Sequence, residues 1–157
     1  RLERPTEETV RLETVDTRDW LGEALAQVAH QAQARNVECR VADGHPPHVC
    51  LHPRYMSRAL LNLVQNAVRY ASGRIEIALT SCPAGGYELV VDDDGPGIED
   101  HERERIFLRG VRMDEQRPGS GLGLDIVRDL AATYGGEVSA ARSPLGGLRV
   151  SLRLPAA

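Results

Sequence analysis

Aromatic side chains are scarce in this sequence, which has one Trp, one Phe and four Tyr among its 157 residues. Leu, Val, Ile and Ala must therefore build the hydrophobic core. No apolar run reaches the roughly 20 residues that a membrane-spanning helix needs. Charges of both signs are interspersed and sum to −4, without a long block of either sign. We therefore expect no nucleic acid among the partners, because its electrostatic signature is missing.

Cysteine is also scarce, and the chain does not start as a secreted protein does. Cys39, Cys50 and Cys82 are odd in number and widely spaced, which indicates reduced thiols in a cytoplasmic protein rather than a disulfide framework. A signal peptide would open with a cationic stretch followed by an apolar one. We therefore expect a cytoplasmic chain, and its opening at Arg1 indicates a fragment of a longer protein. A length of 157 residues suits a single domain.

The periodicity of apolar residues predicts both strands and helices. Alternation predicts strands over residues 9–16, 36–42, 49–51, 74–80, 87–91, 137–141 and 148–154. Helical spacing predicts helices over residues 19–34, 53–70 and 122–134, with a short helical stretch over 102–108. These patterns favour an α+β two-layer sandwich, in which a mixed, mostly antiparallel sheet is covered on one face by three helices.

A polar side of the second predicted helix is the first candidate site. Asn62, Asn66 and Arg69 follow at helical spacing, so they share a face that the apolar stripe does not use. An amide carbonyl oxygen is a hard ligand suited to Mg²⁺, and a guanidinium suits phosphate. Taken by itself, the segment is explained at least as well by a solvated polar face.

The acidic turn at residues 92–98, DDDGPGI, is the second candidate site. A simple exit from a hairpin explains such a turn equally well. A calcium loop does not, because Pro96 would replace an oxygen ligand and Arg103 would replace the bidentate glutamate. A carboxylate beside glycines instead suits a flat ligand close to the backbone, with the carboxylate accepting from an adenine amino group.

A long loop and the glycine-rich segment that ends it form the third and fourth candidates. Residues 109–120 have little periodicity, and such a loop is uncommon inside a domain unless it is functional. The segment Gly119-Ser120-Gly121-Leu122-Gly123-Leu124 opens the third predicted helix, where backbone N–H groups can bind an anion. A dinucleotide-binding turn would need glycine in place of Leu124 and a preceding strand. No P-loop motif occurs anywhere in the sequence.

In this order, the four segments resemble the N, G1, F and G2 boxes of the GHKL ATP-binding fold. The whole arrangement is similar to the catalytic domain of bacterial sensor histidine kinases. The resemblance covers about residues 9–155 and implies a catalytic ATP-binding domain over residues 9–157. Residues 1–8 would then be a connector from a dimerisation and phosphoacceptor domain outside this chain. The F segment departs from the usual Phe-x-Pro-Phe, since residues 106–110 read IFLRG, which puts lid docking by a second Phe in doubt.

The resemblance implies how adenine would be bound. Asp93 would accept hydrogen bonds from the amino group of the base. Gly95 and Gly97 would let the base lie against the backbone beside Ile98, and Tyr70 would stack near the adenine.

The resemblance also implies how the metal and the phosphates of ATP would be bound. Asn66 would supply an oxygen to Mg²⁺, and Asn62 would support it near the phosphates. Phosphotransfer would further depend on Arg112 and Arg117 in the lid loop. The full set of phosphate-binding and lid residues that this implies is Arg69, Arg112, Arg117, Gly119, Ser120, Gly121, Leu122, Gly123 and Leu124.

One position separates kinases from hydrolases within this fold. Gyrase, Hsp90 and mismatch-repair ATPases carry a Glu four residues before the metal-binding Asn, where it activates water. Here that position is Asn62, whose amide cannot take a proton, and loss of a positioned base typically removes about 10² to 10⁴ in rate. The residue therefore favours a kinase over a hydrolase, and the resemblance implies a protein-histidine kinase. A serine kinase of the anti-sigma type and a non-catalytic ATP-binding module are the alternatives.

The remaining expectations follow from the resemblance alone. The γ-phosphoryl group of ATP would pass to a histidine on the missing domain, and from there to a response regulator. The full protein would be a homodimer anchored in the bacterial inner membrane, and the fragment itself would be monomeric. His101-Glu102 lacks the Thr-Pro that follows a phosphoacceptor histidine, so the acceptor is expected elsewhere. A zinc site over residues 45–52 is disfavoured, because two adjacent prolines and strand alternation would splay its side chains.

Overall fold

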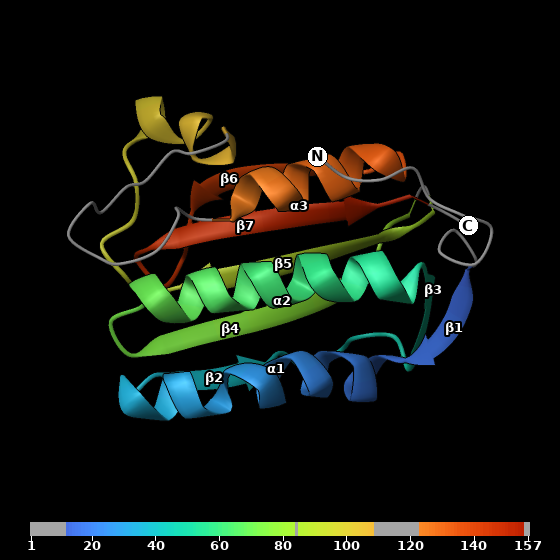
Figure 1. Ribbon diagram of the computed structural model, residues 1–157, viewed down its shortest axis with the longest axis horizontal. Coiled ribbons are helices and arrows are strands. Elements are labelled where there is room, and N and C mark those ends of the chain that lie inside the picture. The colour runs from blue at the N-terminus through green and yellow to red at the C-terminus, as the bar shows by residue number, and fades with distance from the viewer. Residues whose placement is uncertain (1–11, 84, 109–122, 156–157) are drawn as a thin grey trace.

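The computed structural model describes residues 12–83, 85–108 and 123–155 (Figure 1). The elements in chain order are β1 (Glu13–Asp16), α1 (Thr17–Ala34), β2 (Glu38–Val41), β3 (His48–Leu51), α2 (Pro53–Tyr70), β4 (Arg74–Ser81), β5 (Tyr87–Asp93), η1 (Asp100–Glu102), η2 (Arg105–Phe107), α3 (Leu124–Thr133), β6 (Glu137–Arg142) and β7 (Leu148–Leu154). None of the described helices is both long enough and apolar enough to cross a membrane.

Five strands form the main sheet, in the order β2-β4-β5-β7-β6. β2 pairs parallel with β4, whereas the other three pairs are antiparallel. The parallel pair is reached through a crossover that contains β3 and α2, because parallel neighbours cannot be joined by a tight turn. β1 and β3 form a separate antiparallel pair. The predicted mixed, mostly antiparallel sheet is confirmed.

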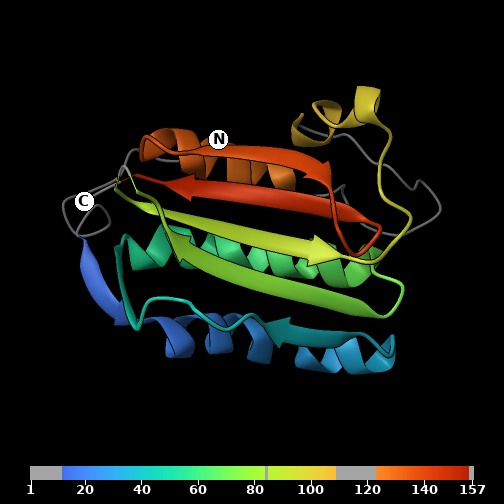
Figure 2. The same cartoon turned by 180° about the vertical axis from the view of Figure 1, so that it is seen from behind.

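The helices α1, α2 and α3 cover one face of the main sheet, and no described helix lies on the opposite face (Figures 1 and 2). The alternation of β4 sends Ile75, Ile77 and Leu79 toward the helices, where each is at most 1% exposed. The residues between them face away from the helices and are more exposed. The two-layer sandwich predicted from the sequence is thereby confirmed.

The helix α2 crosses the centre of the helical layer and carries the first candidate site. Pro53 occupies its first turn, where a missing N–H costs little. Its buried stripe includes Met56, Leu60 and Val64, which pack onto the sheet and hold the helix in place. The bounds of α2 agree with the predicted helix over residues 53–70.

The segment predicted as a short helix over residues 102–108 differs from the prediction. It begins at the last residue of the 3₁₀ turn η1 and contains the 3₁₀ turn η2, where backbone N–H groups bond three residues back, as Leu108 does to Arg105. Both Ile106 and Phe107 are buried, at 1% and 4% exposure. The tighter turn allows these two neighbours to enter the core together while exposed Leu108 leaves it.

The three cysteines are free thiols, and each is partly buried. Cys39 lies in β2, Cys50 lies in β3, and Cys82 follows β4. Burial raises the pKa of the Cys39 thiol, and the nearby charge of Glu38 raises it further. These surroundings disfavour a reactive thiolate at Cys39.

Candidate nucleotide-binding site

The three aspartates at the end of β5 have three different partners. Asp92 is 6% exposed, and its two carboxylate oxygens accept from Arg149 Nε and Nη2 at 2.8 and 3.0 Å. The pair spans the neighbouring strands β5 and β7 in register. A two-pronged ion pair of this kind fixes the end of the sheet, so Asp92 is already engaged within the protein.

Asp94 ties the acidic turn to the segment that follows α2. Its Oδ1 accepts from the backbone N–H groups of Ser72, Gly73 and Arg74 at 2.9, 2.9 and 3.0 Å. Burial alone would raise the pKa of this carboxyl, but the backbone hydrogen bonds outweigh it and hold the pKa below its ordinary value. Asp94 therefore supports the loop that leads from α2 into β4.

Asp93 is the most buried member of the cluster, at 4% exposure against 6% for Asp92. Its Oδ1 accepts from the N–H of Gly95 at 2.9 Å and from the N–H of Leu148 at 3.1 Å. Burial raises the pKa of Asp93 above its ordinary value, and the neighbouring carboxylates add to the rise. The two hydrogen bonds lower the pKa, but they do not cancel the effect of burial. Hydrogen bonds from the acidic turn and from the start of β7 thus hold the carboxyl group in one orientation. Of the three aspartates, Asp93 alone was predicted from the sequence to contact the ligand.

Gly95 brings the acidic turn directly onto the end of α2. A Cβ atom at Gly95 would collide with the carbonyl oxygen of Tyr70, the last residue of that helix. Gly97 has a φ of +74°, which most residues avoid. Both glycines are therefore required by the fold of the turn itself. Their predicted contact with a base, like that of Ile98, stays a prediction.

Asn66 lies on α2 with an unsatisfied acceptor. It is 7% exposed, and its Oδ1 is buried without a hydrogen-bond partner among the described residues. A solvated polar face, the alternative left open by the sequence, does not hold for this residue. A buried carbonyl oxygen without a donor is costly, and a cation or a donor from a ligand would satisfy it.

Asn62 lies one turn before Asn66 and faces the start of α3. Its Nδ2 donates to the carbonyl oxygen of Arg58 at 3.1 Å. Its Oδ1 would lie 3.4 Å from a Cβ atom at Gly123. Gly123 is the N-cap of α3 in the left-handed region, at φ +73°, and no side chain caps the helix there. The structure therefore brings the first and fourth candidate segments together.

Several predicted phosphate ligands lie outside the described residues: Arg112, Arg117, Gly119, Ser120, Gly121 and Leu122. Arg69 and Tyr70 form the last turn of α2, beside the acidic turn. The side chain of Leu124 is fully buried in the core, so a contact between this residue and a ligand would use its backbone.

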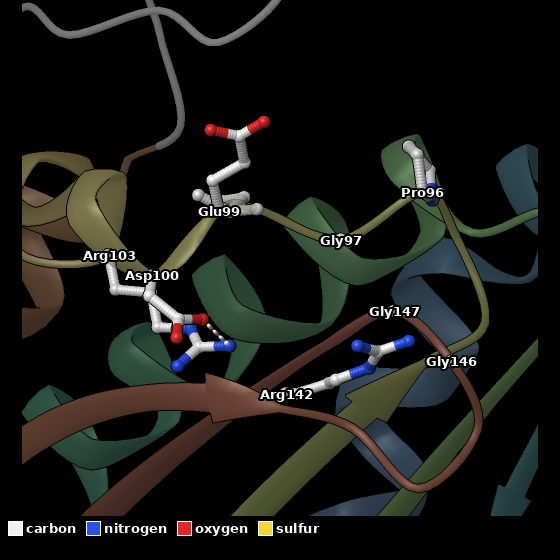
Figure 3. A pocket seen from close by; sticks show the side chains of 9 residues that line it. Pro96, Gly97, Glu99, Asp100, Arg103, Arg142, Gly146 and Gly147 are labelled. Carbon is white, nitrogen blue, oxygen red and sulfur yellow. Dashed lines mark ion pairs between the residues drawn. The ribbon is translucent and has the colours of Figure 1, made fainter.

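A cavity of about 520 Å³ lies beside the loop that continues the acidic turn. Figure 3 shows Pro96 and Gly97 on one side and the Gly146-Gly147 turn on the other, with Arg142 below. Arg103, on the loop side, pairs with Asp100 at 2.7 Å. Neither Asn62 nor Asn66 lines this cavity. It borders the candidate site without containing its polar side chains.

Sequence reasoning missed the β6–β7 turn as part of the site. The sequence predicts strands over residues 137–141 and 148–154, and it gives neither Gly146 and Gly147 between them nor Leu148 a role in the site. The N–H of Leu148 nevertheless contacts Asp93 from 55 residues away. The donor is a backbone N–H group, which does not depend on the type of side chain, so no sequence pattern predicts this contact.

The sequence matches one family model and is similar to bacterial sensor proteins. The sequence model of the family "Histidine kinase-, DNA gyrase B-, and HSP90-like ATPase" matches residues 52–157. The sensor protein kinase CarS of Pseudomonas aeruginosa is 48% identical over 94 residues, which are 60% of this chain and 21% of that protein. The sensor protein RstB of Escherichia coli is 38% identical over 160 residues, which are 99% of this chain and 36% of that protein. The chain thus spans about a fifth to a third of the length of these relatives.

The fold is shared with solved structures as well. Full-length ShkA in complex with AMPPNP aligns with a TM-score of 0.82 at 28% identity. The alignment covers 93% of this chain and 31% of that one. A TM-score of this size over nearly the whole chain shows that the two share one fold.

Proposed function

Because the chain belongs to the family of histidine kinase-, DNA gyrase B- and HSP90-like ATPases, we propose that it is the catalytic, ATP-binding domain of a sensor histidine kinase. The observation that carries the proposal is the buried Oδ1 of Asn66, on the same helix as Asn62, which has no hydrogen-bond partner in the described part of the chain. Relatives named as sensor proteins match 60% and 99% of the chain. Because the chain spans only part of them, the activity of the whole protein belongs to this proposal.

Asp93 binds the adenine in this proposal. Both described hydrogen bonds to its carboxylate end on Oδ1, so Oδ2 is the oxygen that meets the amino group of the base. Because the carboxyl group is held by backbone N–H groups, it does not have to be reoriented when a ligand arrives, which lowers the entropic cost of binding. The pairing with an amino group selects adenine over guanine, whose ring carries a carbonyl at that position.

The phosphates lie between α2 and the start of α3. Asn66 fits a metal site, because its buried amide oxygen has no donor among the described residues and is a hard ligand suited to a cation such as Mg²⁺. Bound Mg²⁺ would neutralise phosphate charge. The first N–H groups of α3 are not capped by a side chain, so they are available to an anion beside Asn62. The predicted roles of Arg69, Arg112 and Arg117 in phosphate binding complete this part of the proposal.

The chemistry of α2 favours transfer to another protein over hydrolysis. The helix Pro53–Tyr70 contains no acidic residue, so no side chain on it can activate water as a carboxylate base. Asn62 holds its Nδ2 on the carbonyl oxygen of Arg58, and an amide cannot take a proton. ATP bound here therefore persists until another nucleophile reaches its γ-phosphoryl group.

The nucleophile in this proposal is a histidine on a dimerisation and phosphoacceptor domain outside the chain. Residues 1–8, which lie outside the described residues, connect the two domains. The phosphoryl group then passes to a response regulator. The full protein is a homodimer anchored in the inner membrane, and the chain alone is a monomer. The similarity to proteins named as sensor kinases supports the transfer to a phosphoacceptor domain and a response regulator in this proposal.

A phosphotransfer assay in trans tests the proposal. The chain is mixed with candidate phosphoacceptor domains and γ-labelled ATP, with and without Mg²⁺. We expect a label that acid removes, as from phosphohistidine. An acid-stable label would instead indicate a serine kinase. Mg-ATP binding without transfer to any acceptor would indicate a non-catalytic ATP-binding module, and absence of Mg-ATP binding in calorimetry would refute the kinase assignment.

A further inference from the structure

The turn between β6 and β7 lies against the carboxylate proposed to contact adenine. Gly147 donates its N–H to the carbonyl oxygen of Asp93 at 3.1 Å, and Leu148 donates to the Oδ1 of the same residue at 3.1 Å. Consecutive N–H groups of one turn thus hold both the backbone and the side chain of Asp93. The turn is far from the acidic cluster in the sequence and adjacent to it in space.

The turn is itself rigidly built. Gly146 donates to the carbonyl oxygen of Ser143 at 2.9 Å, and Ser143 donates to the carbonyl oxygen of Gly147 at 2.8 Å. The Oγ of Ser143 accepts from the N–H of Leu145 at 3.0 Å, and Ser143 is only 3% exposed. These bonds close the turn on itself, so the position of Leu148 is fixed relative to the strands.

The two glycines of the turn are required for different reasons. Gly146 has a φ of +106° and open space around the place of its missing Cβ, so its constraint is the backbone conformation. Gly147 is not in the left-handed region, yet a Cβ atom there would collide with Asp93 Oδ1. The same atom would lie 2.6 Å from both the Asp93 carbonyl oxygen and the Gly95 nitrogen. Gly147 is therefore required because a side chain would not fit beside Asp93.

We propose that Gly147 is a positioning residue for adenine recognition, and that it acts by allowing the β6–β7 turn to hold the Asp93 carboxylate. The inference rests on the proposed function, in which Asp93 accepts from the adenine amino group. The N–H groups of Gly95 and Leu148 occupy Oδ1, and the missing side chain at Gly147 leaves room for that arrangement. The turn thus determines which carboxylate oxygen faces the base.

The test compares two triphosphates that differ only in the amino group. Binding of Mg-ATP and of Mg-purine riboside triphosphate, which lacks that group, is measured by calorimetry on the 157-residue chain. For the unaltered chain we expect ATP to bind about tenfold more tightly, the effect of one hydrogen bond to a charged acceptor. In Gly147→Ala the preference should fall to about twofold or less, because the new Cβ displaces Asp93 Oδ1.

A control and a second variant isolate the cause. Gly22→Ala adds the same methyl group in α1, where no atom lies within 4 Å, and should keep the full preference. Replacement of Leu148 by its α-hydroxy analogue turns the peptide bond before this residue into an ester. The change removes the N–H group that donates to Asp93 and adds no atom near the carboxylate. This ester variant should lose the preference as Gly147→Ala does, and it decides the matter if Gly147→Ala fails to fold.

The outcomes separate this inference from the proposed function. If the unaltered chain prefers ATP and a folded Gly147→Ala or ester variant keeps that preference, the positioning role is wrong. Equal weakening of both triphosphates would also contradict it, because a purely structural effect does not distinguish the amino group. If the unaltered chain binds no Mg-ATP, the proposed function itself falls, and the positioning role falls with it.

Discussion

Replacement of Asn66 by leucine should make the nucleotide-free chain more stable while it abolishes Mg-ATP binding. The Oδ1 of Asn66 is buried without a described partner, and an unsatisfied buried polar group costs about 1–3 kcal/mol. Leucine has nearly the same shape and no polar atom to bury. It is also a better helix former than Asn by a few tenths of a kcal/mol.

The matched control is the same substitution one turn earlier on α2. Asn62→Leu gains the same helix propensity, but it loses the hydrogen bond to Arg58 and relieves no buried acceptor. The free energy of unfolding of Asn66→Leu should therefore exceed that of Asn62→Leu by about 1 kcal/mol or more. For a domain of this size the difference corresponds to about 2–4 °C in Tm for each kcal/mol.

Urea denaturation without nucleotide or metal measures the stability, and calorimetry with Mg-ATP measures the binding. Stability and Mg-ATP binding should change in opposite directions in Asn66→Leu. The unsatisfied Oδ1 that a ligand would use destabilises the nucleotide-free fold. A loss of stability in Asn66→Leu would show that Asn66 is a structural residue. Retention of Mg-dependent ATP binding would remove it as a metal ligand.

Four further substitutions test the acidic turn and the lid. Asp93→Asn should weaken ATP binding about tenfold and blur the preference for adenine over guanine nucleotides in calorimetry; unchanged affinity would refute its role. Asp94→Ala should lower the free energy of unfolding by about 2 kcal/mol at pH 7, since three N–H groups lose their acceptor. Because the folded pKa of Asp94 lies below the unfolded value of 3.8, this contribution is present above about pH 4 and disappears as the pH falls through the folded pKa. Urea denaturation of the unaltered chain and the variant should therefore converge in acid, and a constant difference would contradict the assignment. Arg112→Ala and Arg117→Ala should reduce phosphotransfer in the labelling assay more than they reduce ADP binding, and equal losses would count against a role in transfer.

The elements of the fold could be predicted because their signals are local. The alternation of Ile75, Ile77 and Leu79 predicts β4 with its buried face, and Pro53 marks the start of α2; the structure confirms both. The order of the strands has no such local signal. The parallel pairing of β2 with β4 depends on how the crossover through α2 packs on the sheet, and no pattern in either strand specifies its neighbour.

The candidate site could be predicted only where side chains carry the chemistry. The polar residues of α2 and the acidic turn were recognisable by residue type and spacing. The sequence did not reveal that Asp92 pairs with Arg149, that Asp94 binds the loop after α2, or that Leu148 holds Asp93. These partners are 57, 20–22 and 55 residues away. Two of the three contacts use backbone N–H groups, which every residue except proline offers.

The different partners of the three aspartates explain how a cluster of like charges persists at one turn. Asp92 is neutralised by a guanidinium, and Asp94 is stabilised by three backbone dipoles. Asp93, between them, accepts from two N–H groups among the described residues and has a pKa raised by burial. Its carboxylate therefore has the most to gain from a donor supplied by a ligand. In the proposed function, burial and the neighbouring charges increase the demand of this carboxylate for a hydrogen bond, which the adenine amino group would supply at Oδ2.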